Sequence, residues 1–120
     1  MDKPHKKLDA WKLSMELVSA VYRVTSRFPS HEAYGLTNQI RRAAISIPSN
    51  IAEGAARQTK KEFIKFLHTA QGSLSELDTQ LEIALNLGYI DKGQRDEIDG
   101  SLSRIDKMLT GLIRSQKPEG

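Results

Sequence analysis

The chain has 120 residues, of which 38% are hydrophobic and 6% aromatic, and its formal net charge is +3. This length predicts one domain with its own core, and the absence of cysteine excludes disulfides, thiolate zinc sites and cysteine nucleophiles. No stretch approaches the roughly 18 apolar residues of a membrane-spanning helix, and the basic N-terminus lacks the apolar segment of a signal peptide. We therefore expect a cytoplasmic protein without membrane contact.

The first predicted helix extends from residue 9 to about residue 27, after a basic tail of residues 1–8. Its apolar residues recur at intervals of four, three and four positions: Trp11, Met15, Val18 and Tyr22. This spacing places them on one face of a helix, which we interpret as its core side. Phe28 and Pro29 end the helix.

A second helix is predicted over about residues 33–54, and it contains a proline. Its apolar residues also follow a helical spacing: Leu36, Ile40, Ala43, Ile47 and Ile51. Pro48 lies within this pattern, lacks a backbone donor and presses its ring against the carbonyl of Ala44. We expect a helix kink at Pro48, with Asn50 as a candidate donor to the freed carbonyls.

The third and fourth helices carry the most regular patterns. Thr59 and Glu62 have the spacing of a capping box, and Gly88 fits a left-handed C-cap. Between them, apolar residues repeat every 3.5 positions: Phe63, Leu67, Ala70, Leu74, Leu77, Leu81 and Ala84. The fourth helix, about residues 92–115, repeats the spacing: Ile98, Leu102, Ile105, Leu109 and Leu112. Such a period is typical of helices packed with a left-handed supercoil.

Together these patterns predict an all-α fold, an antiparallel up-down-up-down four-helix bundle over residues 9–116, with residues 117–120 frayed. Further apolar residues lie beside the main stripes: Leu17, Val21, Ile45, Ile64, Phe66, Ile83, Leu87 and Ile113. Two interpretations fit them. They widen the core of one chain, or they form surface that is covered by another subunit.

One segment carries a family resemblance. Residues 34–54 read YGLTNQIRRAAISIPSNIAEG and are followed by KEFIKFL and GSLSELDTQLEIALNLGYI. Over roughly residues 8–113 the chain resembles the four-helix bundle proteins encoded in intervening sequences of 23S rRNA genes, a family that includes accessory (Avd-like) proteins of diversity-generating retroelements. The resemblance implies a ring-like homopentamer with a central channel. For the retroelement proteins it also implies binding of a reverse transcriptase and of nucleic acid through a basic barrel.

Positive charge is concentrated in the segment from residue 41 to residue 65. It contains six basic residues, which are candidate contacts for RNA or DNA phosphates: Arg41, Arg42, Arg57, Lys60, Lys61 and Lys65. The same segment has only two acidic residues, whereas residues 66–90 have three acidic residues and no Lys or Arg. The alternative interpretation is an ordinary solvated surface that keeps the protein soluble.

Polar residues on the second and third helices are candidates for a subunit interface. Arg42 and Ser46 belong to one polar strip, and Glu76, Asp78 and Glu82 lie on the third helix. They either face solvent or meet across subunits, with Arg41 or Arg42 paired to a carboxylate of the third helix.

The motifs of known enzyme classes are absent from the chain. No glutamate is followed three residues later by histidine, as carboxylate metal sites in bundles require. No phosphate-binding glycine loop or nucleophile elbow occurs either. We expect no catalytic residue, metal or cofactor. The leading hypothesis is an oligomeric protein that binds nucleic acid as an accessory to an RNA- or retroelement-related process; the alternative is a protein-protein interaction scaffold without nucleic acid.

Overall fold

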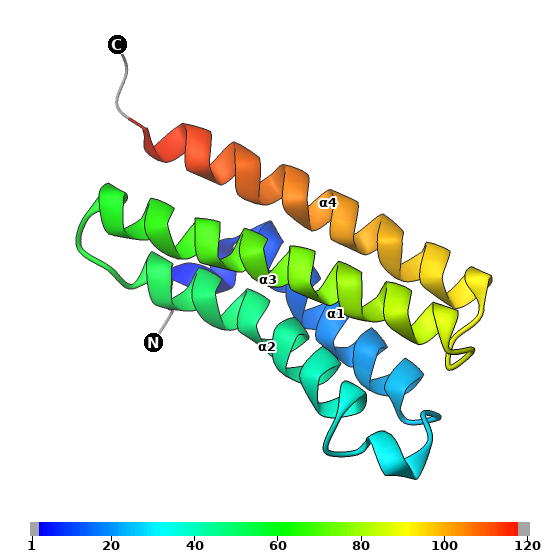
Figure 1. The fold of residues 1–120 in the computed structure, drawn as a ribbon. Helices are drawn as coiled ribbons and strands as arrows, with labels where there is room; N and C mark the ends of the chain where they lie inside the picture. Colours follow the sequence, from blue (N-terminus) through cyan, green and yellow to red (C-terminus); the bar gives the residue numbers. More distant parts are fainter. Residues whose placement is uncertain (1–2, 118–120) are drawn as a thin grey trace.

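The computed structural model describes residues 3–117, which form helices and contain no strand. The elements are η1 (Pro4–Lys7), α1 (Asp9–Thr25), η2 (Ser30–Glu32), α2 (Leu36–Ala55), α3 (Lys60–Asn86) and α4 (Lys92–Gln116) (Figure 1). The predicted all-α class and its four helices are confirmed. The fraying predicted for residues 117–120 concerns, apart from Lys117, residues outside the described part.

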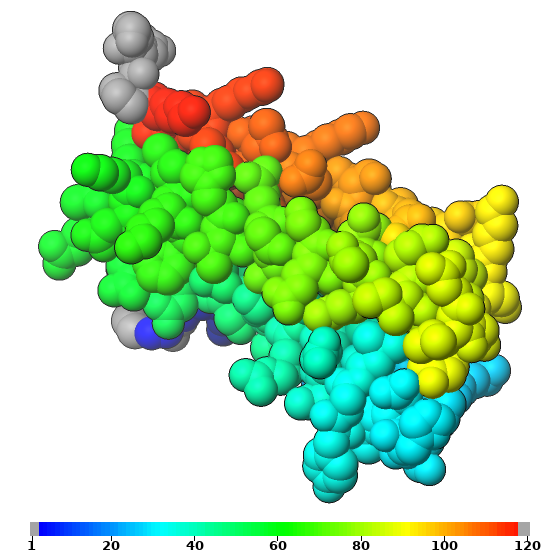
Figure 2. Space-filling model, viewed as in Figure 1, coloured from blue at the N-terminus to red at the C-terminus, as the bar shows by residue number. Residues whose placement is uncertain are grey.

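Each long helix packs against its neighbour in the sequence, and α4 also packs against α1. The molecule is elongated, with principal extents of 48 × 30 × 19 Å. Figure 2 shows α3 and α4 side by side along one long face. No helix within residues 3–117 is long and apolar enough to cross a membrane.

The segment expected as a basic N-terminal tail is partly folded onto the bundle. Its 3-10 helix η1 packs against α1 and α2, and the ring of His5 contacts Trp11 edge-on at a centroid distance of 4.9 Å. Leu8 is partly buried against the core. The spacing of apolar residues did not predict η1, because none of the four residues of η1 is buried.

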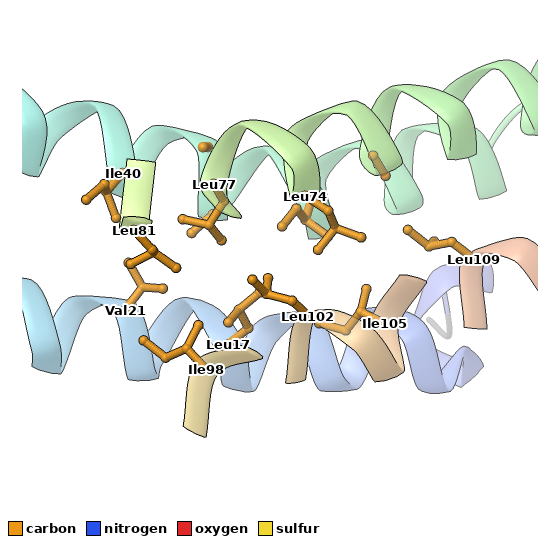
Figure 3. Packing of buried hydrophobic residues seen from close by; sticks show 14 of the residues in the cluster. Leu17, Val21, Ile40, Leu74, Leu77, Leu81, Ile98, Leu102, Ile105 and Leu109 are labelled. Atoms are coloured by element: carbon orange, nitrogen blue, oxygen red, sulfur yellow. The ribbon is translucent and has the colours of Figure 1, made fainter. Parts of the chain in front are cut away.

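The core lies between all four helices (Figure 3). The predicted stripes of α2, α3 and α4 are buried apart from Leu36, Phe63 and Leu112, which are half-buried at its margin. Gly54 lies inside α2, and a Cβ there would approach the Cβ of Phe66 to 2.7 Å. Glycine at this position therefore allows α2 and α3 to pack closely.

The core face predicted for α1 is wrong. The buried residues of this helix are Ala10, Ser14, Leu17, Val21 and Thr25. Met15 and Tyr22 are 44% and 40% exposed. The apolar spacing gave the wrong face because two of these buried residues, Ser14 and Thr25, are polar. Each hydroxyl is satisfied within the helix: Ser14 Oγ donates to the carbonyl of Trp11 and Thr25 Oγ1 to that of Val21, both at 2.8 Å.

Helix α2 continues without a break through Pro48, which is buried. The side-chain amide of Asn50 donates to the carbonyl and the hydroxyl of Ser46, at 2.8 and 2.9 Å. The suggestion that it serves the carbonyl freed by the proline, that of Ala44, is therefore wrong. Tertiary packing on both sides of α2 holds the proline inside a helix that it would otherwise destabilise.

The C-cap predicted at Gly88 is confirmed, whereas only one of the two hydrogen bonds of the capping box predicted for Thr59 and Glu62 forms. Thr59 Oγ1 accepts the N–H of Glu62 at 3.1 Å, and Gly88 has φ of 78°. Asp91 and Gln94 form a complete capping box at the start of α4. The short connection between α3 and α4 is therefore fixed at both ends by local hydrogen bonds.

The additional apolar residues divide between core and surface. Leu17, Val21 and Ile113 are buried, so the wide-core interpretation holds for them. Three others are exposed at 41%, 43% and 54%: Ile45, Ile83 and Leu87. Ile64 and Phe66 are half-buried.

Candidate functional site

One end of the bundle collects the basic residues of several helices. The start of α3 adjoins the end of α4, because Lys60, Lys61 and Gln116 line one hollow, and the end of α4 adjoins the residues around Lys7. The helix η1 and the end of α4 both lie at this end (Figure 1). We call residues 3–16, 53–65 and 106–117 the basic end; they contain eleven Lys and Arg against five Asp and Glu.

The rest of the described chain has the opposite balance. Residues 17–52 and 66–105 contain seven Lys and Arg against eight Asp and Glu. The net charge of +3, which also counts Asp2 and Glu119, therefore combines a positive end with a slightly negative remainder. Such separation creates a local positive potential that the net charge conceals.

At the basic end, Arg57 is held by two neighbours. Its Nη2 donates to Glu53 Oε2 at 2.8 Å, and its guanidinium lies 4.8 Å from the ring centroid of Phe66. Lys60, Lys61 and Lys65 are exposed and form no ion pair within residues 3–117. Three exposed lysine charges beside one anchored guanidinium are suited to phosphate groups.

The other two predicted basic contacts, Arg41 and Arg42, lie elsewhere. Arg57 lies sixteen positions after Arg41, just beyond the end of α2, which corresponds to roughly 24 Å of helix. Arg41 Nε donates to Thr25 Oγ1 at 2.8 Å, and its guanidinium lies 4.4 Å from the ring centroid of Tyr22. The six candidates therefore form two separate groups rather than one patch.

The carboxylates expected at a subunit interface have partners within the chain. Asp78 and Glu82 form ion pairs with Arg95 of α4, not with Arg41 or Arg42 of the same chain. Glu76 accepts a hydrogen bond from Gln80 at 3.2 Å. Pairing of these residues across subunits stays a prediction, but Asp78 and Glu82 already balance a charge of their own chain.

Ser46, another interface candidate, lies between α2 and α3. Its hydroxyl is 2.8 Å from that of Ser73 and also accepts from Asn50. Arg42 is exposed and makes no side-chain hydrogen bond among the described residues. Both residues lie on one face of α2, one turn apart, with Ser46 at the contact with α3 and Arg42 exposed beside it.

Arg95, which no sequence pattern had marked, is the buried centre of an acidic cluster. Its side chain is 7% exposed and forms ion pairs with Asp78, Glu82 and Asp99. Burial lowers the pKa of Arg95, but its carboxylate partners outweigh this and raise it. Burial and the nearby carboxylates, chiefly Asp78, raise the pKa of Asp99 against the opposing effect of Arg95. Arg95 lies three residues before Ile98 and seven before Leu102, on the same face of the helix. This spacing was the only sign in the sequence that Arg95 is buried.

An apolar hollow lies between α1 and α2. Its lining consists mainly of apolar side chains: Trp11, Met15, Val18, Ile45, Pro48, Ser49 and Ala52. This is the face that the sequence assigned to the core of α1. The structure leaves it open to solvent.

At the opposite end from the basic residues, Glu32 joins two loops. Its Oε1 accepts the N–H of Leu36 at 3.2 Å, and its Oε2 accepts the hydroxyl of Tyr89 at 2.9 Å. The ring of Tyr89 also packs on Phe28 at a centroid distance of 5.3 Å. The hydrogen bonds from Leu36 and Tyr89 lower the pKa of Glu32. No group of three or more His, Asp or Glu within residues 3–117 is placed to hold a metal ion.

Comparisons with known proteins address the family and the fold. The family model described as 23S rRNA-intervening sequence protein matches residues 6–111. The crystal structure of a protein of unknown function from the S23 ribosomal protein family of Bacteroides thetaiotaomicron superposes with a TM-score of 0.81 at 24% identity. The match covers 88% of this chain and 98% of that one, and shows that the fold is shared. No curated protein matches the chain significantly.

Proposed function

Because this chain belongs to the family of 23S rRNA-intervening sequence proteins, we propose that it is a non-catalytic oligomer that associates with RNA or DNA through its basic end. The observation that carries the proposal is the convergence of α1, α3, α4 and the connection after α2 on one positively charged end. Lys60, Lys61 and Lys65 project there without carboxylate partners among the described residues, so they are free to bind phosphates.

The oligomer of this proposal is a ring-like homopentamer of up-down-up-down antiparallel bundles in the cytoplasm. The packing of each helix on its sequence neighbours, and of α4 on α1, supports the antiparallel order. The open hollow between α1 and α2 supplies apolar surface for a second subunit. Five copies would carry about +15, which strengthens attraction to nucleic acid. The resemblance to Avd-like proteins supports the number five.

Salt-dependent binding tests the nucleic-acid proposal. We expect a fluorescently labelled duplex DNA or single-stranded RNA to bind with an affinity that falls steeply with salt. The logarithmic slope is about 0.9 per neutralised phosphate on duplex DNA and about 0.7 on a single strand. Changing Arg57, Lys60, Lys61 and Lys65 to Ala should weaken binding to all sequences equally and flatten this slope.

A matched pair of double variants locates the contact. Lys60→Ala with Lys61→Ala and Lys92→Ala with Arg104→Ala each remove two exposed positive charges, but only the first pair belongs to the basic end. We expect the first pair to lose more affinity and slope than the second. Equal losses would contradict a contact at the basic end, and no binding by the intact oligomer near physiological salt would contradict the function.

The second candidate function is a protein-protein interaction scaffold, and the apolar hollow between α1 and α2 favours it. Met15 and Ile45 remain 44% and 41% exposed there. Under this function the basic residues only keep the protein soluble. A protein partner would then bind in the hollow with little dependence on salt.

A further inference from the structure

The guanidinium of Arg41 lies over the ring of Tyr22, far from the basic end. The guanidinium covers the ring at 4.4 Å, and its Nε donates to the buried hydroxyl oxygen of Thr25 at 2.8 Å. Two contacts therefore hold the guanidinium in place over the ring. An arginine held in this way loses little side-chain entropy when it binds a ligand.

The fixed guanidinium keeps binding capacity. Within residues 3–117, its Nη1 and Nη2 atoms donate no hydrogen bond and form no ion pair. Because the tether uses Nε, these two donors remain available to an oxyanion. Arg41 is half-buried, not enclosed, and a guanidinium that lies over one ring can receive a second flat group on its other face.

The surroundings favour an anionic ligand. Residues 17–49 contain four arginines and a single acidic residue, Glu32. Both carboxylate oxygens of Glu32 are occupied, one by the N–H of Leu36 and the other by the hydroxyl of Tyr89. The positive charge of Arg41 and of the exposed Arg42 is thus not compensated within their own segment of the chain.

We propose that Arg41, stacked on Tyr22, is a contact for single-stranded nucleic acid, in which an unpaired base stacks on the guanidinium and the adjacent phosphate accepts from Nη1 and Nη2. The site rests on the proposed function and names its substrate class. A duplex cannot use this surface, because its bases are already stacked on one another. Unpaired bases are recognised on aromatic rings and arginine planes, with little preference for sequence.

The experiment compares two labelled oligonucleotides of equal length and equal phosphate number, a 20-nucleotide oligo(dA) and an abasic strand. Fluorescence anisotropy at about 0.15 M salt gives both affinities. We expect the parent protein to bind oligo(dA) about tenfold more tightly than the abasic strand, the contribution of a stacked base. The abasic strand retains the phosphate contacts of the basic end.

Arg41→Lys is the decisive variant, because lysine keeps the positive charge but lacks the planar guanidinium on which a base could stack. We expect it to lose the preference for oligo(dA) while binding the abasic strand as the parent does. Tyr22→Leu should do the same, since Tyr22 is 40% exposed and its loss leaves the core intact. The control is Arg42→Lys, an exposed arginine with no aromatic partner in the described structure, which should keep the preference.

The outcomes separate the two proposals. Equal binding of both strands by the parent, or an unchanged preference in Arg41→Lys, overturns the stacking site and leaves the basic end in place. Absence of binding to either strand overturns the proposed function together with this site. Circular dichroism and the mass of the assembly, measured for each variant, show that a lost preference does not come from unfolding.

Discussion

Gly54 of α2 lies so close to Phe66 of α3 that an added Cβ would be 2.7 Å from the Cβ of the phenylalanine and 3.3 Å from the carbonyl oxygen of Phe63. The second distance matters because a backbone atom cannot rotate away. The contact holds α2 and α3 together near the basic end. Any side chain at this position must push the two helices apart.

We predict that Gly54→Ala destabilises the protein despite the better helix propensity of alanine. The propensity gain is about 1 kcal/mol, whereas overpacking costs about 1–3 kcal/mol. Gly72 of α3 is the control, because a Cβ there meets nothing within 4 Å. Gly72→Ala should therefore raise the free energy of unfolding in urea denaturation. Stabilisation by both variants would contradict the close packing of α2 on α3.

We predict that acid weakens the link between the two loops that Glu32 joins. Its pKa is lowered below 4.5 by hydrogen bonds from Leu36 and Tyr89, against an opposing effect of burial. A carboxyl with a lowered pKa stabilises the folded state above its unfolded pKa, and this contribution is lost as pH falls through the folded pKa.

The measurement is the melting temperature of the parent and of Glu32→Gln between pH 7 and pH 2. We expect a lower value for the variant at pH 7 and convergence of the two in acid. Glu97→Gln serves as the control, since Glu97 is exposed and forms no ion pair within residues 3–117. A constant difference at every pH would show that the ionised carboxylate is not what holds the loops.

We predict that Arg95 stabilises the packing of α4 on α3 through its carboxylates. Removing one member of a buried ion pair costs about 3–5 kcal/mol, but here the acidic side chains are 42–59% exposed, so we expect about 1–3 kcal/mol for Arg95→Met. Urea denaturation at pH 7 measures the loss. Adding Asp78→Asn and Asp99→Asn to Arg95→Met should recover part of it, because the repulsion between the remaining carboxylates is then removed. No recovery would indicate that lost packing, not charge, is responsible.

How far the sequence predicts the structure depends on what each buried position contains. Helix α3 is predicted well because six of its eight buried residues are Leu or Ala, and these six follow the heptad spacing. Helix α1 is predicted on the wrong face because Ser14 and Thr25 are buried, and their hydroxyls bond to carbonyls of their own helix. Hydrophobic spacing cannot detect a polar residue that satisfies itself locally.

The candidate site shows a similar limit. The types of residue in the site were predictable, since six lysines and arginines occur between positions 41 and 65. The division of these residues into two groups could not be predicted, because it depends on the length of α2, which separates Arg41 from Arg57 by about four helical turns. The contact between Tyr22 and Arg41 depends on the packing of α1 on α2, and no motif records it.

The error on α1 leads to the last prediction, because it leaves an apolar face open. Trp11, Met15 and Val18 line the hollow with Ile45 and Pro48 of α2, although their spacing is that of a core stripe. We therefore predict that Met15→Glu breaks up the homo-oligomer without unfolding the chain, since a carboxylate cannot be buried unpaired in an apolar contact.

Multi-angle light scattering at micromolar concentration measures the mass of the assembly against 13.4 kDa for one chain. The parent is expected at five times this mass and Met15→Glu well below it. The control Gln39→Glu adds the same charge at an exposed position of α2 that does not line the hollow, and should keep the parent mass. Pro48→Ala removes a ring from the hollow and should loosen the assembly less. A monomeric parent would exclude self-association, whereas an intact oligomer of Met15→Glu would place the subunit contact on another face, because an unpaired charge in the hollow would then have cost nothing.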